Sequence, residues 1–180
     1  MAGSVSFMSH VVSKEGRATG KRYAEVQVGG SLLMSTPGQF QIGVTRGNPP
    51  PGGAAGLTSD DGGVAWNGKG RIEQSNVILW SYAYADILLG DDVVCMAMDL
   101  DGGKLWITRN NDGWIGDGDP DAGTTPTATI VAGTWYVGTC AGANIGFGPE
   151  TLPFYWPVTI RTKEEQFTRS VRPSTFTQFA

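Results

Sequence analysis

Apolar and polar residues alternate along several short segments of the chain, a pattern typical of β-strands that bury one face. From Tyr23 to Val28, aromatic or polar side chains alternate strictly with Ala and Val. In contrast, residues 92–100 are almost continuously apolar, which predicts a strand covered on both faces. An Asp-Gly-Gly turn at residues 101–103 and a second apolar segment at 104–108 follow, so these two segments are predicted to form a hairpin.

Similar patterns predict strands along most of the chain. The other predicted strands are residues 4–12, 39–45, 63–66, 72–80, 135–140, 144–147 and 158–161. No long segment has the period of about 3.6 residues that marks an amphipathic helix. Short strands separated by glycine-rich turns predict an all-β fold, a two-sheet antiparallel β-sandwich.

Both ends of the chain are predicted to lie outside this sandwich, which we place at residues 20–160. Residues 1–19 are predicted to form an N-terminal arm, in which 4–12 could be a first strand. Residues 161–180 turn polar, which predicts a C-terminal tail that orders only against a partner. The arm and the tail are therefore expected to be assembly contacts, with a homo-oligomer as one expected form.

Composition supports the all-β assignment and argues against several function classes. The chain contains 27 Gly and 6 Trp in 180 residues, which suits strands joined by tight turns. Its net charge is −4 and it has no stripe of Lys or Arg, so nucleic-acid binding is not expected. It has no apolar run long enough to span a membrane, and its N-terminus lacks the features of a signal peptide. We therefore expect no membrane insertion and no export through a signal peptide.

The two cysteines, Cys95 and Cys140, each lie in an apolar, strand-like segment. This placement predicts two buried free thiols. A disulfide stays open as an alternative if the two strands are neighbours. Two cysteines alone do not complete a zinc site.

Five segments, in the same order along the chain, resemble the signature of the SPRY family. They are residues 20–26 (GKRYAEV), 41–44 (QIGV), 90–107, 110–114 (NNDGW) and 144–154. The block at 90–107 is the most specific, because it is similar to the family's Gly-Asp turn, apolar strand, Asp-containing turn and aromatic-containing strand. The resemblance implies a concanavalin A-like jelly-roll sandwich that serves protein interaction and sometimes glycan contact, with no known catalytic centre.

The chain departs from the family pattern in three places. An extra Asp lies in the turn at 90–92, Ala24 replaces an aromatic residue, and residues 114–126 form a long insertion. The insertion is similar to the version found in bacteriophage and prokaryotic SPRY-like proteins, which are often virion components. This implies a bacteriophage virion protein made in the host cytoplasm, as a tail fibre, receptor-binding or capsid-decoration component that contacts a host receptor, a glycan or other virion proteins. The alternative is an intracellular SPRY adaptor module that recognises a short peptide.

The insertion also contains alternating carboxylates, which raises the question of a calcium site. Asp117, Asp119 and Asp121 stand two apart, as in loops that converge on a hard cation. Such a loop needs Gly at its sixth position and Glu at its twelfth, and here those positions are Ala122 and Ala128. A solvated acidic loop is therefore the favoured interpretation. No metal site is assigned, and these three aspartates are the only candidates.

The sequence offers little that points to catalysis. His10 is the single histidine, and the chain has no G-x-S-x-G motif, so a nucleophilic triad has no support. Asp99 and Asp101 flank a hairpin turn, where turn capping explains them better than a pair of hydrolytic carboxylates does. We expect a non-enzymatic protein without a cofactor, and keep a polysaccharide-cleaving enzyme as a minor alternative.

The aromatic residues provide the main candidates for ligand binding. Trp80, Tyr82 and Tyr84 stand two apart, so an extended segment places their rings on one face. Such a strip either binds a sugar or protein partner or packs as core, and packing as core is the favoured interpretation. Trp114 lies in a loop rich in Gly and Asp, where an exposed and a packed ring are equally expected. With Asp112 and Asp117, these residues form the candidate binding site.

Overall fold

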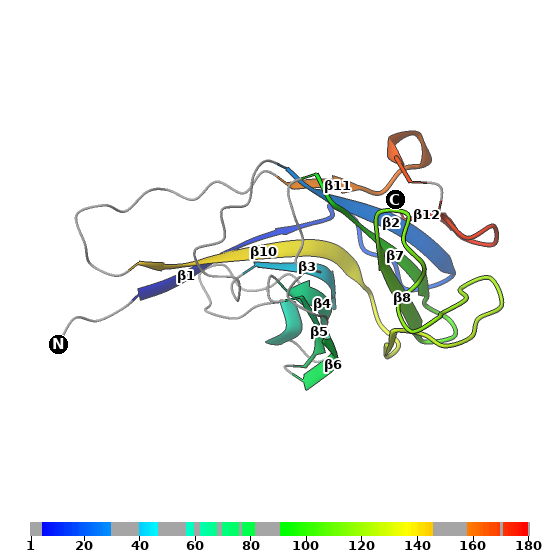
Figure 1. Cartoon of the computed structure of the whole chain (residues 1–180), viewed down its shortest axis with the longest axis horizontal. Coiled ribbons are helices and arrows are strands. Elements are labelled where there is room, and N and C mark those ends of the chain that lie inside the picture. Colours follow the sequence, from blue (N-terminus) through cyan, green and yellow to red (C-terminus); the bar gives the residue numbers. More distant parts are fainter. Residues whose placement is uncertain are drawn as a thin grey trace.

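The protein is a sandwich of two β-sheets (Figure 1). The computed structural model describes residues 5–29, 40–46, 57–59, 62–67, 70–75, 77–81, 91–145, 158–169 and 171–179. The first sheet has the order β1 (Val5–Val12), β10 (Tyr136–Ile145), β3 (Phe40–Thr45), β4 (Val64–Asn67), β5 (Arg71–Gln74) and β6 (Val77–Ser81). The second sheet has the order β11 (Val158–Arg161), β2 (Lys21–Val28), β7 (Val93–Asp99), β8 (Lys104–Arg109) and β9 (Ala128–Thr129).

Neighbouring strands in both orders are antiparallel, which confirms the predicted two-sheet antiparallel sandwich. The short strand β12 (Thr177–Gln178) is the exception, because it pairs with the start of β2 in parallel. Two short 3₁₀ turns, η1 (Leu57–Ser59) and η3 (Glu164–Gln166), lie outside the sheets. None of the helices in the described part of the chain is long and apolar enough to cross a membrane.

The main core fills the space between the two sheets. Strand β2 contributes the Ala and Val side chains of its strict alternation, and β7 contributes Val94, Met96 and Met98. The predicted hairpin is confirmed, because Asp99 on β7 pairs with Lys104 on β8 across the turn. At that turn the Asp99 carboxylate accepts a hydrogen bond from the backbone N–H of Gly102 at 2.8 Å, as expected of a capping residue.

The outer face of the second sheet carries a second apolar cluster. We call it the outer cluster; it consists of Tyr23, Val93, Cys95, Ala97, Trp106 and Phe176. Three further side chains pack against it, those of Trp114, Phe167 and Val171. Strand β7 is therefore buried on both faces, as its continuous apolar sequence predicts. Phe167, Val171 and Phe176 come from the end of the chain. We call the described residues of 162–179 the C-terminal strap.

The strap corrects the prediction of a tail outside the sandwich. Phe176 and Phe179 are buried, and the backbone N–H of Phe179 donates to the carbonyl of Tyr23 at 3.1 Å. The N-terminal arm is likewise part of the sandwich, because β1 pairs with β10 along its whole length. The tail was predicted to lie outside the sandwich because residues 161–180 are mostly polar. A few apolar residues among many polar ones are nevertheless enough to complete the outer cluster.

Two strand boundaries also differ from the prediction. The single strand expected at residues 72–80 is a hairpin of β5 and β6, and Ser75 lies in its turn with a positive φ of 49°. The two strands expected at 135–140 and 144–147 are one continuous β10, which ends among the described residues at Ile145. Residues 146 and 147 lie outside the described part of the chain.

The two thiols lie in different sheets, Cys95 on β7 and Cys140 on β10. Both are buried and free, which confirms the predicted state, and the disulfide alternative is wrong because the strands are not neighbours. Burial raises the pKa of the Cys95 thiol to about 12 and that of the Cys140 thiol to about 11. Both side chains therefore stay neutral, as small packed groups.

Candidate functional site

The candidate site is built around residues 110–118, which follow β8 and which we call the rim loop. Its start is fixed by Asn110, whose φ is +54° and whose amide nitrogen donates to the Asp92 carboxylate at 2.7 Å. The hydroxyl of Thr108 lies 2.9 Å from the backbone carbonyls of both Asp112 and Gly113. These contacts tie the loop back onto its own strand, so its shape is set largely by the residues next to it in sequence.

Two consecutive residues of the rim loop pack on opposite sides of the second sheet. Ile115 enters the main core between the sheets, and its backbone N–H donates to the carbonyl of Ile107 at 3.1 Å. Trp114 packs instead against the outer cluster under the strap. The loop therefore wraps around the edge of β8. Trp114 is half-buried in this arrangement, between the exposed and the packed positions that the sequence left open.

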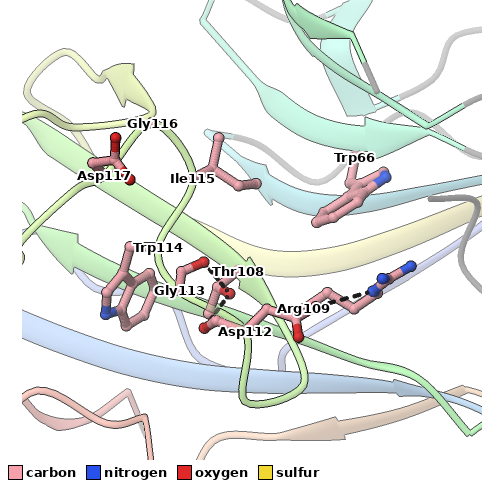
Figure 2. Close-up of a pocket in the computed structure, with 9 residues that line it drawn as sticks. All are labelled: Trp66, Thr108, Arg109, Asp112, Gly113, Trp114, Ile115, Gly116 and Asp117. Atoms are coloured by element: carbon pink, nitrogen blue, oxygen red, sulfur yellow. Dashed lines mark hydrogen bonds and ion pairs between the residues drawn. The ribbon is translucent and has the colours of Figure 1, made fainter. Parts of the chain in front are cut away.

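A pocket of about 360 Å³ opens beside the rim loop (Figure 2). Its lining residues are Trp66, Thr108, Arg109, Asp112, Gly113, Trp114, Ile115, Gly116 and Asp117. Trp66, Trp114 and Ile115 give it apolar walls, and Asp112 and Asp117 place two exposed carboxylates at its rim. The Asp112 carboxylate lies 3.4 Å from the Arg109 guanidinium, and 61% of the Asp112 side chain is exposed. The Asp112 carboxylate is therefore accessible to a ligand, whereas the Arg109 side chain is only 22% exposed.

Trp80 supports the rim loop from the first sheet. A Cβ added at Gly116, whose φ is +72°, would lie 2.8 Å from the Trp80 ring, so the loop fits against this indole only with a glycine there. The Trp80 indole N–H donates to the carbonyl of Thr127 at 3.3 Å. Trp80 is 37% exposed and so is neither a free binding ring nor a fully packed one. The other members of the predicted aromatic strip, Tyr82 and Tyr84, lie outside the described residues.

The three aspartates of the insertion have different surroundings. Asp117 is exposed at the pocket with a φ of +56°. Asp119 accepts a hydrogen bond from the backbone N–H of Ala122 at 3.0 Å, which shapes a turn. Asp121 contacts the strap, as its carboxylate accepts hydrogen bonds from the backbone N–H groups of Ser174 and Thr175, both at 2.9 Å. No three of the His, Cys, Asp and Glu side chains in the described part of the chain are gathered to hold a metal ion.

The hydrogen bonds to Asp121 also set its charge. Slight desolvation raises the pKa of this carboxyl, but the hydrogen bonds from Thr175 and Ser174 outweigh it and lower the pKa below the usual value of 3.8. The carboxylate is therefore ionised over the whole neutral range. It serves as an acceptor for backbone donors of the strap.

Sequence reasoning identified part of the pocket. It selected Asp112, Trp114 and Asp117, which the structure brings together. It did not select Trp66, which lies in the main core and also lines the pocket, or Arg109, which immediately precedes the SPRY-like NNDGW segment. The position of Arg109 was a usable signal, because loop ends and strand ends meet at a pocket rim. The place of Trp66 in the pocket lining could not be predicted from the sequence, because it depends on how the two sheets face each other.

Comparison with solved structures supports the fold. The crystal structure of the SPRY domain of human HERC1 is similar, with a TM-score of 0.58 and 13% sequence identity, over 89% of this chain and 84% of that chain. No protein-family model matches the sequence, and no curated protein matches it. The likeness therefore concerns architecture, and defines this chain as a SPRY-like β-sandwich.

Proposed function

We propose that this SPRY-like sandwich is a protein-recognition module that binds a partner segment in the rim-loop pocket. One observation carries the proposal: a loop held to its own strand by the Thr108 hydroxyl places two exposed carboxylates around an apolar-walled pocket. A rigid scaffold that presents such a loop is a common basis for recognition. The similar fold of a SPRY domain supports this reading at the level of architecture.

The lining chemistry defines the kind of partner segment. The walls formed by Trp66, Trp114 and Ile115 suit an apolar side chain, and large flat rings contribute much contact area at low entropy cost. Asp112 and Asp117 at the rim suit a cationic side chain next to that apolar one. We therefore expect a peptide in which an apolar residue neighbours Lys or Arg, bound more weakly as salt is added.

A displayed library of random peptides, selected on the full-length protein, tests this proposal. Selected peptides should contain an apolar residue beside Lys or Arg, and Asp117→Asn should weaken their binding roughly fivefold, as measured by fluorescence polarisation. Asp91→Asn is the matched control, because Asp91 is also exposed with a positive φ but does not line the pocket. Peptides without a cation, or equal weakening by both substitutions, would show that the pocket is not the site.

The biological setting that we propose is a bacteriophage particle, where the module would be a tail-fibre, receptor-binding or capsid-decoration component. This step is supported only by the resemblance of residues 114–126 to phage-type sequences. Host receptors, glycans and other virion proteins are the partners that this setting suggests. The second candidate, an intracellular adaptor for a short peptide, has the same pocket chemistry in its favour. Mass spectrometry of purified particles separates the two, since only a virion protein is present at stoichiometric levels.

A further inference from the structure

We propose that strand β6 is the surface through which two copies of this chain pair. Among the described strands, β6 is the last of the first sheet and pairs only with β5 (Figure 1). All five of its residues are exposed. The exposed fractions are 61% for Val77, 48% for Ile78, 37% for Leu79 and 37% for Trp80. Four consecutive apolar residues are therefore open to solvent on a strand that already has the extended shape needed for pairing.

This edge lacks the charged or proline residues that usually protect a free edge. Edge strands are commonly protected by Lys, Pro or an inward-pointing charge, because their unpaired backbone groups otherwise recruit another strand. The edge strand β11 in the second sheet follows this rule, as it ends in Arg161 and most of its residues are half-buried. The sequence of β6, VILWS, contains no charged residue and no proline. An unprotected apolar edge of this kind marks an interaction surface.

The occupant that fits this strand is a second β6. In a two-fold symmetric pair each strand meets itself in the antiparallel direction, so a charge at or next to the symmetry axis would lie close to a like charge on its copy. Strand β6 avoids this conflict because it has none. With the axis at Leu79, that residue faces its own counterpart, and Val77 and Ile78 face Ser81 and Trp80 of the other copy. The two first sheets would then form one continuous sheet.

Apolar burial, more than backbone hydrogen bonds, should stabilise this pair. The pairing of β5 with β6 shifts register between Ile72 and Glu73, which leaves Leu79 in a bulge and shortens any ladder that forms on the outer side. A stable homodimer buries about 1,600 Å² or more in total, and one short strand supplies only part of that area. We expect a concentration-dependent dimer. Because each copy has a net charge of −4, added salt should strengthen it.

This interface is separate from the proposed binding pocket. Trp80 is the residue of β6 that contacts the rim loop, and none of the strand's residues lines the pocket. Because β6 and the pocket lining share no residue, the two proposals are tested by different substitutions, and either can fail without the other. Their salt dependences also have opposite signs, since the dimer should strengthen and the peptide complex should weaken.

Light scattering on the full-length chain over a range of concentrations tests the pairing. The unmodified chain should approach twice its monomer mass, and Leu79→Lys, which places two Lys residues face to face, should return it to a monomer. Val11→Lys is the matched control, because Val11 is 55% exposed on β1 at the opposite edge of the same sheet. It should leave the dimer intact. A monomer at every concentration, open-ended growth, or loss of the dimer in Val11→Lys would each overturn the proposal.

Hydrogen exchange keeps the test valid if Leu79→Lys folds poorly. In the unmodified chain, amides of residues 77–81 should exchange at least several-fold more slowly at high than at low protein concentration. Amides of β7, which is buried on both faces, should exchange at the same rate in both samples. Equal exchange of residues 77–81 at the two concentrations, in a sample whose mass shows dimer, would place the interface elsewhere.

Discussion

The outer face of the second sheet and the β6 edge of the first sheet both present apolar side chains, but among the described residues only the outer face is covered by another segment of the chain. On the second sheet, Trp106 packs edge-to-face against Phe176 of the strap, with ring centroids 6.1 Å apart. On the first sheet, Ile78 and Leu79 of β6 are exposed, with no such partner in the described part of the chain. The same physical driving force is therefore satisfied within the chain in one region and left for a partner in the other.

A buried charge explains why the strap covers one particular surface. Glu25 on β2 is fully buried, and its carboxylate accepts hydrogen bonds from the Thr168 backbone N–H at 2.9 Å, the Thr168 hydroxyl at 3.0 Å and the Arg169 backbone N–H at 3.0 Å. The Tyr23 hydroxyl lies 3.2 Å from the same carboxylate. Arg161 lies 4.0 Å away. These directional contacts fix the register of the strap, whereas the exposed side chains of β6 are apolar except for that of Ser81.

Removal of an aromatic anchor of the strap should have the largest effect. Phe179 is fully buried in the main core, so Phe179→Ala should lower the free energy of unfolding by about 4 kcal/mol. Phe167 is only half-buried, although its ring lies 4.9 Å from that of Tyr23. Phe167→Ala should therefore cost about 2 kcal/mol. Urea denaturation of both variants measures the difference. Equal losses would mean that the end of the strap is no better packed than its middle.

Loss of the buried carboxylate should have the next largest effect. Glu25→Ala removes the acceptor of the buried Tyr23 hydroxyl and of three part-buried donors of Thr168 and Arg169, so the free energy of unfolding should fall by about 3 kcal/mol. Glu165→Ala is the matched control, because Glu165 is exposed in η3 of the same strap and its loss should change little. Urea denaturation again provides the measurement.

The two thiols show whether Glu25→Ala acts locally. Cys95 lies beneath the strap, whereas Cys140 packs with Leu57 and Ala65 on the other sheet. Opening of the strap should make Cys95 react with a thiol reagent many-fold faster under native conditions and leave the rate at Cys140 unchanged. Equal acceleration at both thiols would indicate global unfolding, and the directional role of Glu25 would then lose its support.

The same contrast shows what sequence patterns can predict. The hairpin of β7 and β8 was predictable because its partners are close in sequence and a turn signal lies between them. The strap was not, since Glu25 and Thr168 are distant in sequence and each looks like an ordinary surface residue. The β5–β6 hairpin was missed for a third reason: the turn at Ser75 lacks Gly or Pro, and the apolar residues on both sides resemble one strand.

The residues of the candidate site also fall into a group that the sequence predicts and a group that it does not. Asp112, Trp114 and Asp117 were predictable because one loop carries them all, and local contacts such as those of Thr108 shape that loop. Trp66 reaches the pocket only because the two sheets face each other in a particular way. Patterns with the period of one strand report which face of that strand is buried, and carry no information on what lies opposite.

The smallest effect is expected at Asp121, where the insertion meets the strap. Asp121→Asn replaces one acceptor oxygen by an NH₂ group, so either Thr175 or Ser174 loses a hydrogen bond at an exposed site. The loss of stability should be well below that of Glu25→Ala.

The contribution of Asp121 to stability should depend on pH. The pKa of Asp121 is lowered in the folded state, so this contribution is complete above the usual value of 3.8 and is lost as the pH falls through the folded pKa. The difference in urea midpoint between the unmodified chain and Asp121→Asn should therefore be constant near neutral pH and vanish in acid. Asp117→Asn, at an exposed aspartate of the same insertion that lines the pocket instead of contacting the strap, should change the urea midpoint at neutral pH little. A pH-independent difference for Asp121→Asn would mean that the ionised carboxylate does not anchor the strap, and that the apolar residues of the outer cluster, with Glu25 beneath, hold it alone.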